Sequence, residues 1–258
     1  SWRNLISVGA KPIAITNCLN FGSPENEENM GEFVECVQGL SEASSYLDFP
    51  VVSGNVSFYN QTKDVGIKPT PVIGGVGLIK DYKNMITMNI KQVDNILLVI
   101  GKTEGHLGQS LFSREILNEK NGPPPEINLF NEKNNGETIL KLIDKKFIKS
   151  AHDVSLGGII TALSKMCIKG KIGATLNKPN YLINQFEYLF GEDQGRYIIE
   201  IKKVNYIEVA EILEKNSVHY DELATVNKNE LIIDNKTKVT IDDLIKSHTT
   251  WLTNYMSK

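Results

Sequence analysis

The stretch VVSGNVSFYN, residues 51–60, runs from two valines into Ser-Gly-Asn and then alternates small polar and apolar residues. We interpret it as a strand, a break at Gly54 and a second strand. Side chains two positions apart share one face of an extended segment, so Asn55 and Ser57 are expected on the same side. A turn would explain Gly54, but it would not explain two polar side chains on one face.

Gly54, Asn55 and Ser57 are together suited to contact with a phosphate-bearing ligand. Backbone N–H groups around a glycine can approach a phosphate closely, because no Cβ intervenes. The amide oxygen of Asn55 is a hard ligand suited to Mg²⁺, and the Ser57 hydroxyl can donate to an anion. The alternative from residue types alone is a β-bulge at Gly54 with a surface asparagine.

Strand and helix patterns surround this stretch in the first part of the chain. Alternation over residues 11–18 predicts a strand, and apolar residues at helical spacing over 31–47 predict a helix. Residues 72–79 have the pattern of a buried strand thinned by glycines. The prolines in TKDVGIKPTP, residues 62–71, predict a loop without regular structure.

The second part of the chain opens with NILLVIG, residues 95–101, a continuous apolar run typical of a strand covered on both faces. Helix and strand patterns alternate from there to the end. The pattern changes around residues 80–93, where we place a domain boundary. We therefore predict an α+β fold of two domains, residues 1–92 and 93–258, each a mixed sheet packed on helices.

Two further segments place polar side chains at the ends of expected strands. Asn17 and Asn20 end the first strand, where two amides could hold a ligand; an Asx-turn is the alternative. In KSAHDVSLGG, residues 149–158, Asp153 or Ser155 is expected to N-cap the next helix. The first turn of such a helix favours anions, although simple capping with close helix–sheet packing explains the same residues.

The segment LFGEDQGRY, residues 189–197, brackets two carboxylates, an amide and an arginine with glycines. It could bind Mg²⁺, ribose or phosphate. It could equally form a self-neutralised turn in which Arg196 pairs with Glu192 or Asp193, a pair that contributes little if exposed.

Composition excludes several classes of protein. The net charge is −3 and no basic cluster is visible, which argues against a nucleic-acid partner. No apolar run approaches the ~18 residues that span a bilayer, so no membrane partner is expected. The three cysteines form no C-x-x-C pair, which indicates a reducing, cytoplasmic compartment. P-loop, Ser-His-Asp and His-cluster patterns are absent from the sequence.

Several segments together resemble one enzyme family. They stand in the order and spacing of phosphoribosylformylglycinamidine synthase of the large-subunit type, within the aminoimidazole ribonucleotide synthetase superfamily: KPIAITNCLNFGSPE, VVSGNVSFYN, IKPTPVIGGVGLI, SAHDVSLGG and LFGEDQGRY. The family polypeptide holds two copies of a two-domain unit. This chain resembles the second copy, and SWRNLISVGA at its start has the pattern of a helix tail, so we expect a fragment of a longer polypeptide.

The resemblance implies a function for that polypeptide. It implies an ATP- and Mg²⁺-dependent C–N ligase that converts formylglycinamide ribonucleotide to formylglycinamidine ribonucleotide in de novo purine biosynthesis. ATP would phosphorylate the formamide oxygen, and ammonia would displace the phosphate. The ammonia would come from glutamine through a glutaminase subunit or domain, and a small adaptor subunit is compatible with this arrangement.

The resemblance also implies roles position by position. It implies ATP contacts at Asn17 and Gly54, a Mg²⁺ ligand at Asn55 and a substrate contact at Ser57. Asn17 replaces a usual aspartate, with Cys18 beside it in place of a usual asparagine, and Leu156 replaces another aspartate. The catalytic histidines of the family lie in the first copy, so we expect no catalytic residue in this chain and no activity from the chain alone.

Two other interpretations stay open. The chain could belong to another ATP-dependent enzyme of the superfamily, such as aminoimidazole ribonucleotide synthetase or selenophosphate synthetase, although these would not carry SGNVSFYN. It could also be a degenerate, non-catalytic copy retained for packing and assembly. The GEDQGR turn resembles the substrate-binding turn of the first copy, and in this copy it could serve an auxiliary nucleotide site.

Overall fold

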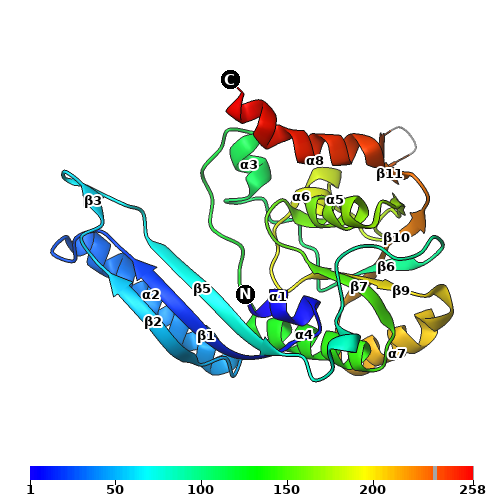
Figure 1. The fold of residues 1–258 in the computed structure, drawn as a ribbon, viewed down its shortest axis with the longest axis horizontal. Helices are drawn as coiled ribbons and strands as arrows, with labels where there is room; N and C mark the ends of the chain where they lie inside the picture. The colour runs from blue at the N-terminus through cyan, green and yellow to red at the C-terminus, as the bar shows by residue number, and fades with distance from the viewer. Residues whose placement is uncertain (235–236, 258) are drawn as a thin grey trace. The chain divides into compact units, whose positions relative to one another are not determined.

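The computed structural model describes residues 1–234 and 237–257. The chain divides into two compact units (Figure 1). Unit 1 comprises residues 1–6 and 10–80, and unit 2 comprises residues 7–9 and 81–258. The division between the two units falls after Lys80.

Unit 1 is a small three-stranded sheet with one long helix along it (Figure 1). The central strand β1 pairs in parallel with β2 and antiparallel with β5, in the order β2-β1-β5. Ile15 and Leu19 of β1 are buried, whereas no residue of α2 is. The elements that contribute to this unit are α1 (Trp2–Ser7), β1 (Lys11–Asn20), α2 (Glu27–Tyr46), β2 (Val51–Ser57), β3 (Gln61–Thr62), β4 (Val65–Gly66) and β5 (Thr70–Leu78).

Three expectations for unit 1 are wrong. The strand β2 runs unbroken through Gly54, and its bulge lies instead at Val52, because Ile15 pairs with Val51 and Thr16 with Ser53. The strand β5 is not buried, and its Val72 is 54% exposed, because β5 is an edge strand. The segment 62–71 is not free of regular structure, since β3 and β4 pair and β5 begins at Thr70, whose neighbouring prolines an edge strand tolerates.

Unit 2 is a seven-stranded mixed sheet with helices packed on it, in the order β12-β11-β8-β10-β6-β9-β7. All pairs are antiparallel except β8 with β11. Its elements are η1 (Tyr82–Asn84), β6 (Ile96–Ile100), α3 (Leu111–Glu115), α4 (Leu129–Asp144), β7 (Ile148–Asp153), α5 (Gly158–Gly170), β8 (Gly173–Leu176), α6 (Gln185–Phe190), β9 (Tyr197–Ile201), η2 (Lys203–Asn205), α7 (Tyr206–Lys215), β10 (Tyr220–Asn227), β11 (Glu230–Ile232), β12 (Lys238–Thr240) and α8 (Ile241–Met256).

The core of unit 2 forms where α5 packs on the sheet. Every residue of β6 is buried, as the apolar run predicts, and Leu97 and Val99 share one cluster with Leu163 and Cys167 of α5. Both units combine strands and helices, so the predicted α+β class is confirmed.

The start of α5 differs from the prediction. Its N-cap is Gly157, at φ 80°, so the cap residue itself has no side chain to offer. Asp153 cannot take that role because it still belongs to β7, where it pairs with Tyr197. Four residues then turn the chain before the helix begins, and a Cβ at Gly157 would overlap the Thr161 hydroxyl. Capping by Asp153 or Ser155 is therefore wrong.

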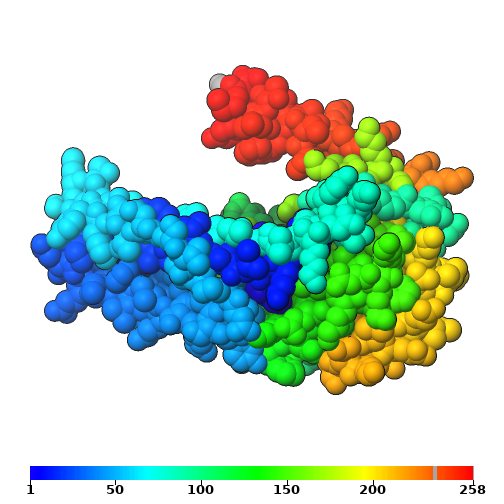
Figure 2. Space-filling view, turned by 60° about the horizontal axis from the view of Figure 1, so that its bottom comes forward, coloured from blue at the N-terminus to red at the C-terminus, as the bar shows by residue number. Residues whose placement is uncertain are grey.

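The last helix, α8, is amphipathic at its start and exposed at its end. Leu244 and Ile245 pack against the core of unit 2, whereas Trp251 and Tyr255 stack on each other at 64% and 62% exposure. Figure 2 shows the end of α8, in red, projecting from the neighbouring parts of the same unit. Among the described residues no helix combines the length and apolarity needed to cross a membrane.

Candidate functional site

The register of β1 against β2 brings the predicted site residues of unit 1 onto adjacent rungs. Asn17 pairs with Gly54, Cys18 with Asn55, and Asn20 with Ser57. Residues in register on paired strands present their side chains to the same face, and successive residues alternate. The four predicted residues are therefore neighbours, but they are divided between the two faces of the sheet.

Asn55 and Ser57 share one face with Cys18 and Asn20. The Nδ2 of Asn55 lies 3.9 Å from the Cys18 Sγ, and the Nδ2 of Asn20 lies 3.5 Å from the same sulfur. Ser57 is tied at its end of the strand to Asn60, with 3.3 Å between Oγ and Oδ1. The expectation that Asn55 and Ser57 lie on one side is met, because the bulge precedes both of them.

Asn17 lies on the opposite face, toward α2. It lines a cavity of about 360 Å³ together with Leu19, Pro50 and Val51 and with residues of α2 that include three serines, Ser41, Ser44 and Ser45. The cavity is bounded by amide and hydroxyl groups as well as apolar side chains. A ligand on the Asn55 face would not meet the Asn17 amide directly, because the sheet separates the two faces.

The Asn17 side chain on the neighbouring strand explains why residue 54 is a glycine. Its backbone lies within an unbroken strand and is not in the left-handed region, so no turn requires glycine there. A Cβ at position 54 would overlap the Asn17 Oδ1 and come within 3.2 Å of the Asn17 carbonyl oxygen. The glycine therefore makes room for an amide from the next strand, a reason that the sequence did not reveal.

The residues on the Asn55 face fit a Mg²⁺ ion held mainly by phosphates. Among the described residues, no group of three or more His, Cys, Asp or Glu side chains could hold a metal ion. Asn55 is exposed, and its Nδ2, not its Oδ1, faces the Cys18 sulfur, so that contact does not engage the Oδ1. Mg²⁺ commonly takes one or two protein oxygens and completes its shell with water and substrate phosphate.

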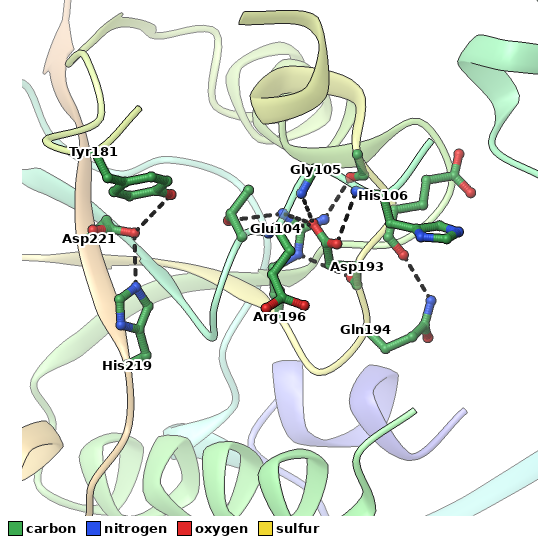
Figure 3. A network of polar contacts seen from close by, with 12 residues as sticks. Glu104, Gly105, His106, Tyr181, Asp193, Gln194, Arg196, His219 and Asp221 are labelled. Carbon is green, nitrogen blue, oxygen red and sulfur yellow. Dashed lines mark hydrogen bonds and ion pairs between the residues drawn. The ribbon is translucent and has the colours of Figure 1, made fainter. Parts of the chain in front are cut away.

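The acidic turn in unit 2 forms the predicted pairing of Arg196 with Asp193, at 3.5 Å, but in a buried rather than exposed position (Figure 3). The fully buried guanidinium also donates to Thr103 Oγ1 at 3.1 Å, to the Gly191 carbonyl at 2.6 Å and to the Asp193 carbonyl at 3.0 Å. The arginine of the turn is thus bonded to other groups of the turn and to Thr103 of the same unit.

Beside this turn lies a polar cavity of about 550 Å³ that the sequence did not reveal. Its lining comes from four separate segments, which include Lys102–Glu104, α4, the turn itself and His219. Asn128, Asn131 and Asn135 lie on one face of the start of α4 and all line the cavity. Their helical spacing is the feature of the sequence that could have pointed to this cavity. Asn135 donates to the Gly195 carbonyl at 2.9 Å, which ties α4 to the turn.

A tyrosine and a histidine meet one carboxylate on β10 (Figure 3). Asp221 accepts from the Tyr181 hydroxyl at 3.4 Å and lies 3.2 Å from His219 Nε2. Burial, and next the charge of Asp221, raise the pKa of Tyr181 to about 12. Tyr181 therefore stays protonated near neutral pH and serves as a hydrogen-bond donor to the carboxylate.

The fold and these motifs define a family. Residues 92–234, more than half of the chain, match the model of the AIR synthase related protein, C-terminal domain, and residues 1–79 match that of the N-terminal domain. The chain therefore belongs to the AIR synthase related proteins.

Curated relatives narrow the resemblance. Over 256 residues, 99% of this chain, it is 85% identical to phosphoribosylformylglycinamidine synthase subunit PurL of Pelagibacter ubique (strain HTCC1062). It is 41% identical to the same subunit of Azorhizobium caulinodans over an equal length. The match covers 35% of each relative, so the chain spans about a third of their length. The predicted resemblance to this synthase is confirmed.

Solved structures confirm the fold. PurL of T. maritima complexed with FGAR superposes with a TM-score of 0.73 at 19% identity, covering 94% of this chain and 41% of that one. HypE of E. coli superposes with a TM-score of 0.70 at 16% identity, covering 92% and 75%. At these identities the likeness concerns the fold alone.

Proposed function

We propose that this chain is part of a phosphoribosylformylglycinamidine synthase and contributes one wall of its active site. The observation that carries the proposal is the 85% identity to a PurL subunit over nearly the whole chain. Within this chain, the pairing of β1 with β2 holds Asn55 and Ser57 on one face of the sheet. The reaction would convert formylglycinamide ribonucleotide to the amidine with ATP and glutamine-derived ammonia. Complexes of T. maritima PurL with ATP and with FGAR support this choice of ligands.

Each residue of the site would have a distinct task. The Asn55 Oδ1 would bind the Mg²⁺ of Mg-ATP, and the Ser57 hydroxyl would donate to the ribonucleotide. Backbone N–H groups near Gly54 would face the phosphates of ATP. The Asn17 amide lies on the other face, beside α2, so it would not contact the same Mg-ATP directly. When bound, Mg²⁺ neutralises charge on the phosphates.

Partners and location follow from the same proposal. A glutaminase subunit or domain would supply ammonia, and a small adaptor subunit is compatible with this. A solved assembly named PurLQS from Thermotoga maritima supports a multi-subunit enzyme. We propose that the protein lies in the cytoplasm. That compartment is reducing, which agrees with Cys18, Cys36 and Cys167 being free thiols.

The experiment is steady-state kinetics of the complete enzyme that contains this chain. Asn55→Ala should lower the rate with Mg-ATP about 30- to 1,000-fold, since a lost hard ligand at a phosphoryl-transfer site costs about 2–4 kcal/mol. Ser57→Ala should mainly raise the KM for the ribonucleotide, provided that it contacts substrate and transition state alike. Varying Mg²⁺ separates the two effects.

Asn254→Ala is the matched control, because Asn254 is an exposed asparagine of α8 in unit 2 and is no part of the β1–β2 rungs. It should leave both kinetic constants unchanged. Wild-type kinetics for Asn55→Ala would overturn the proposed site and favour the degenerate, non-catalytic copy instead. Melting temperatures measured alongside distinguish lost ligand binding from lost folding.

A further inference from the structure

Glu192 binds the start of two helices at once. Its Oε1 accepts from the backbone N–H of Leu111, the first residue of α3, at 2.8 Å and from that of Gly157, the N-cap of α5, at 2.7 Å. Glu192 is only 8% exposed. Since no side chain of its own segment caps α5, a carboxylate from a distant turn takes that role.

Asp193 binds three consecutive backbone N–H groups of one loop (Figure 3). Its Oδ2 accepts from Glu104 at 3.2 Å and from Gly105 at 3.0 Å, and its Oδ1 accepts from His106 at 3.1 Å. Gly105 has φ +82°, a conformation that turns successive N–H groups toward one point. Such a nest is a common binding site for phosphate and other anions, but here it holds a carboxylate of the same chain.

These five N–H groups, of residues 104–106, 111 and 157, form what we call the amide cradle. Cradles of this kind bind phosphate in many nucleotide-binding proteins. Every donor of this one already bonds to Glu192 or Asp193, both of which are buried. The Arg196 guanidinium beside Asp193 compensates one of the two negative charges.

We infer that Glu192 and Asp193 are built-in anions that occupy the amide cradle, so that the 191–196 turn binds no nucleotide phosphate in this chain. The pair instead ties loop 104–106, α3 and α5 to one end of the sheet in unit 2. A phosphate would have to displace two buried carboxylates. It would also approach a cavity lined by Glu104, which is paired with Lys102, and by Glu126 and Glu132, whose like charge opposes a phosphate.

Hydrogen exchange of the full chain tests this assignment at the level of single amides. Without any added anion, all five amides should be protected in the wild-type chain. Glu192→Gln should speed exchange at 111 and 157 by about tenfold or more, because a neutral amide is a weaker acceptor than a carboxylate. Asp193→Asn should do the same at 104–106 only. Peptide fragmentation by electron transfer resolves the two sets.

Added anions supply the second measurement. Inorganic phosphate and ADP should leave the five amides of the wild-type chain unchanged. In Glu192→Ala the vacated N–H groups should donate to acetate, which should restore protection at 111 and 157 and raise the Tm relative to equal concentrations of chloride. Glu208→Ala is the matched control, since Glu208 is an exposed glutamate in the first turn of α7 and its loss should create no acetate dependence.

The outcomes separate clearly. Phosphate or ADP that increases protection of the cradle in the wild-type chain would overturn the inference and make the turn a ligand site. Unchanged exchange at all five amides in both Gln and Asn variants would overturn the assigned bonds. If Glu192→Ala does not fold, the conservative variants still decide between these outcomes. Because the readout is exchange in unit 2, it is independent of the kinetics that test Asn55.

Discussion

The Oδ1 of Asn17 lies against the Cα of Gly54 on the neighbouring strand, in the space that a Cβ of residue 54 would fill. The two residues are therefore a matched pair, in which the size of one sets the limit for the other. This relationship explains a glycine in the middle of an unbroken strand, where it otherwise weakens the structure.

The pair predicts a non-additive response to mutation. Gly54→Ala should destabilise the chain by about 1–3 kcal/mol, the usual cost of forcing an extra group into a filled space. In an Asn17→Ala background the same change should cost much less, because the overlapping amide is gone. Urea unfolding of the four proteins measures the coupling.

Gly39→Ala provides the matched glycine control. Gly39 lies inside α2, and nothing within 4 Å would meet its Cβ. This change should raise stability by about 0.5–1 kcal/mol, because alanine loses less backbone freedom than glycine in a helix. Additive costs for Gly54→Ala and Asn17→Ala would contradict the steric account.

A second prediction concerns the buried carboxylate of Glu200 on β9, which is 0% exposed. It accepts from the backbone N–H groups of Lys91 and Gln92, from Asn95 Nδ2 at 2.7 Å and from Ser150 Oγ at 2.8 Å. Glu200→Gln would bring amide hydrogens against some of these donors. We expect a loss of about 1–3 kcal/mol in the free energy of unfolding.

Urea unfolding of Glu200→Gln beside Glu222→Gln tests this expectation. Glu222 is exposed on β10, so its change should stay within about 0.5 kcal/mol. Equal stabilities for the two variants would show that the Glu200 carboxylate does not hold the 91–95 segment.

The third prediction is a pH dependence that originates at Cys167. Burial raises the pKa of its thiol to about 12, from an ordinary value of 9.0. Between these values the unfolded chain loses the proton and the folded chain keeps it, so stability falls as pH rises. Below pH 9.0 the contribution is fully present. The slope should be up to about 1.4 kcal/mol per pH unit from this thiol.

Unfolding free energies of the wild-type chain and of Cys167→Ala from pH 8 to 11 measure this contribution. The variant is expected to be less stable at every pH, because a buried side chain is shortened. Only the difference in slope reports on the thiol, since Tyr181 and Tyr220, whose pKa values are about 12, titrate in both proteins. Parallel curves would contradict the prediction.

The fourth prediction is that the 258-residue chain alone has no synthase activity. None of the residues proposed for the site, Asn17, Gly54, Asn55 and Ser57, can act as a general acid or base near neutral pH. Release of ADP from ATP, Mg²⁺, ammonia and formylglycinamide ribonucleotide is the measurement. Turnover that depends on the ribonucleotide would show that the chain needs no further residues.

Much of the fold could be predicted from local patterns. The alternation in residues 11–18 and the apolar run in 95–101 identify β1 and β6, since burial on one or both faces leaves a direct periodic signal. The exposure of β5 could not be predicted this way. Its valines have the pattern of a buried strand, and only the sheet order shows that β5 is an edge.

The candidate site was predicted less completely. The pattern of residues 51–60 correctly puts Asn55 and Ser57 on one face, because both follow the bulge at Val52. The division of Asn17 from Asn55 by the sheet depends on the register between two strands, which neither strand encodes by itself. Likewise, Glu192 accepts from the first N–H groups of α3 and α5, although it lies more than thirty residues beyond the start of α5.

The sequence by itself determined the α+β class, the family resemblance and which residues carry hard oxygens suited to Mg²⁺ and phosphate. These properties depend on local periodicity, residue type and the order of motifs. Only the tertiary structure decided which partner each polar group meets. Gly54 leaves room for the Asn17 amide of the neighbouring strand. The carboxylates of Glu192 and Asp193 accept from backbone N–H groups of other segments. Buried polar groups must find partners wherever the fold brings donors close, and that proximity arises between segments far apart in the chain.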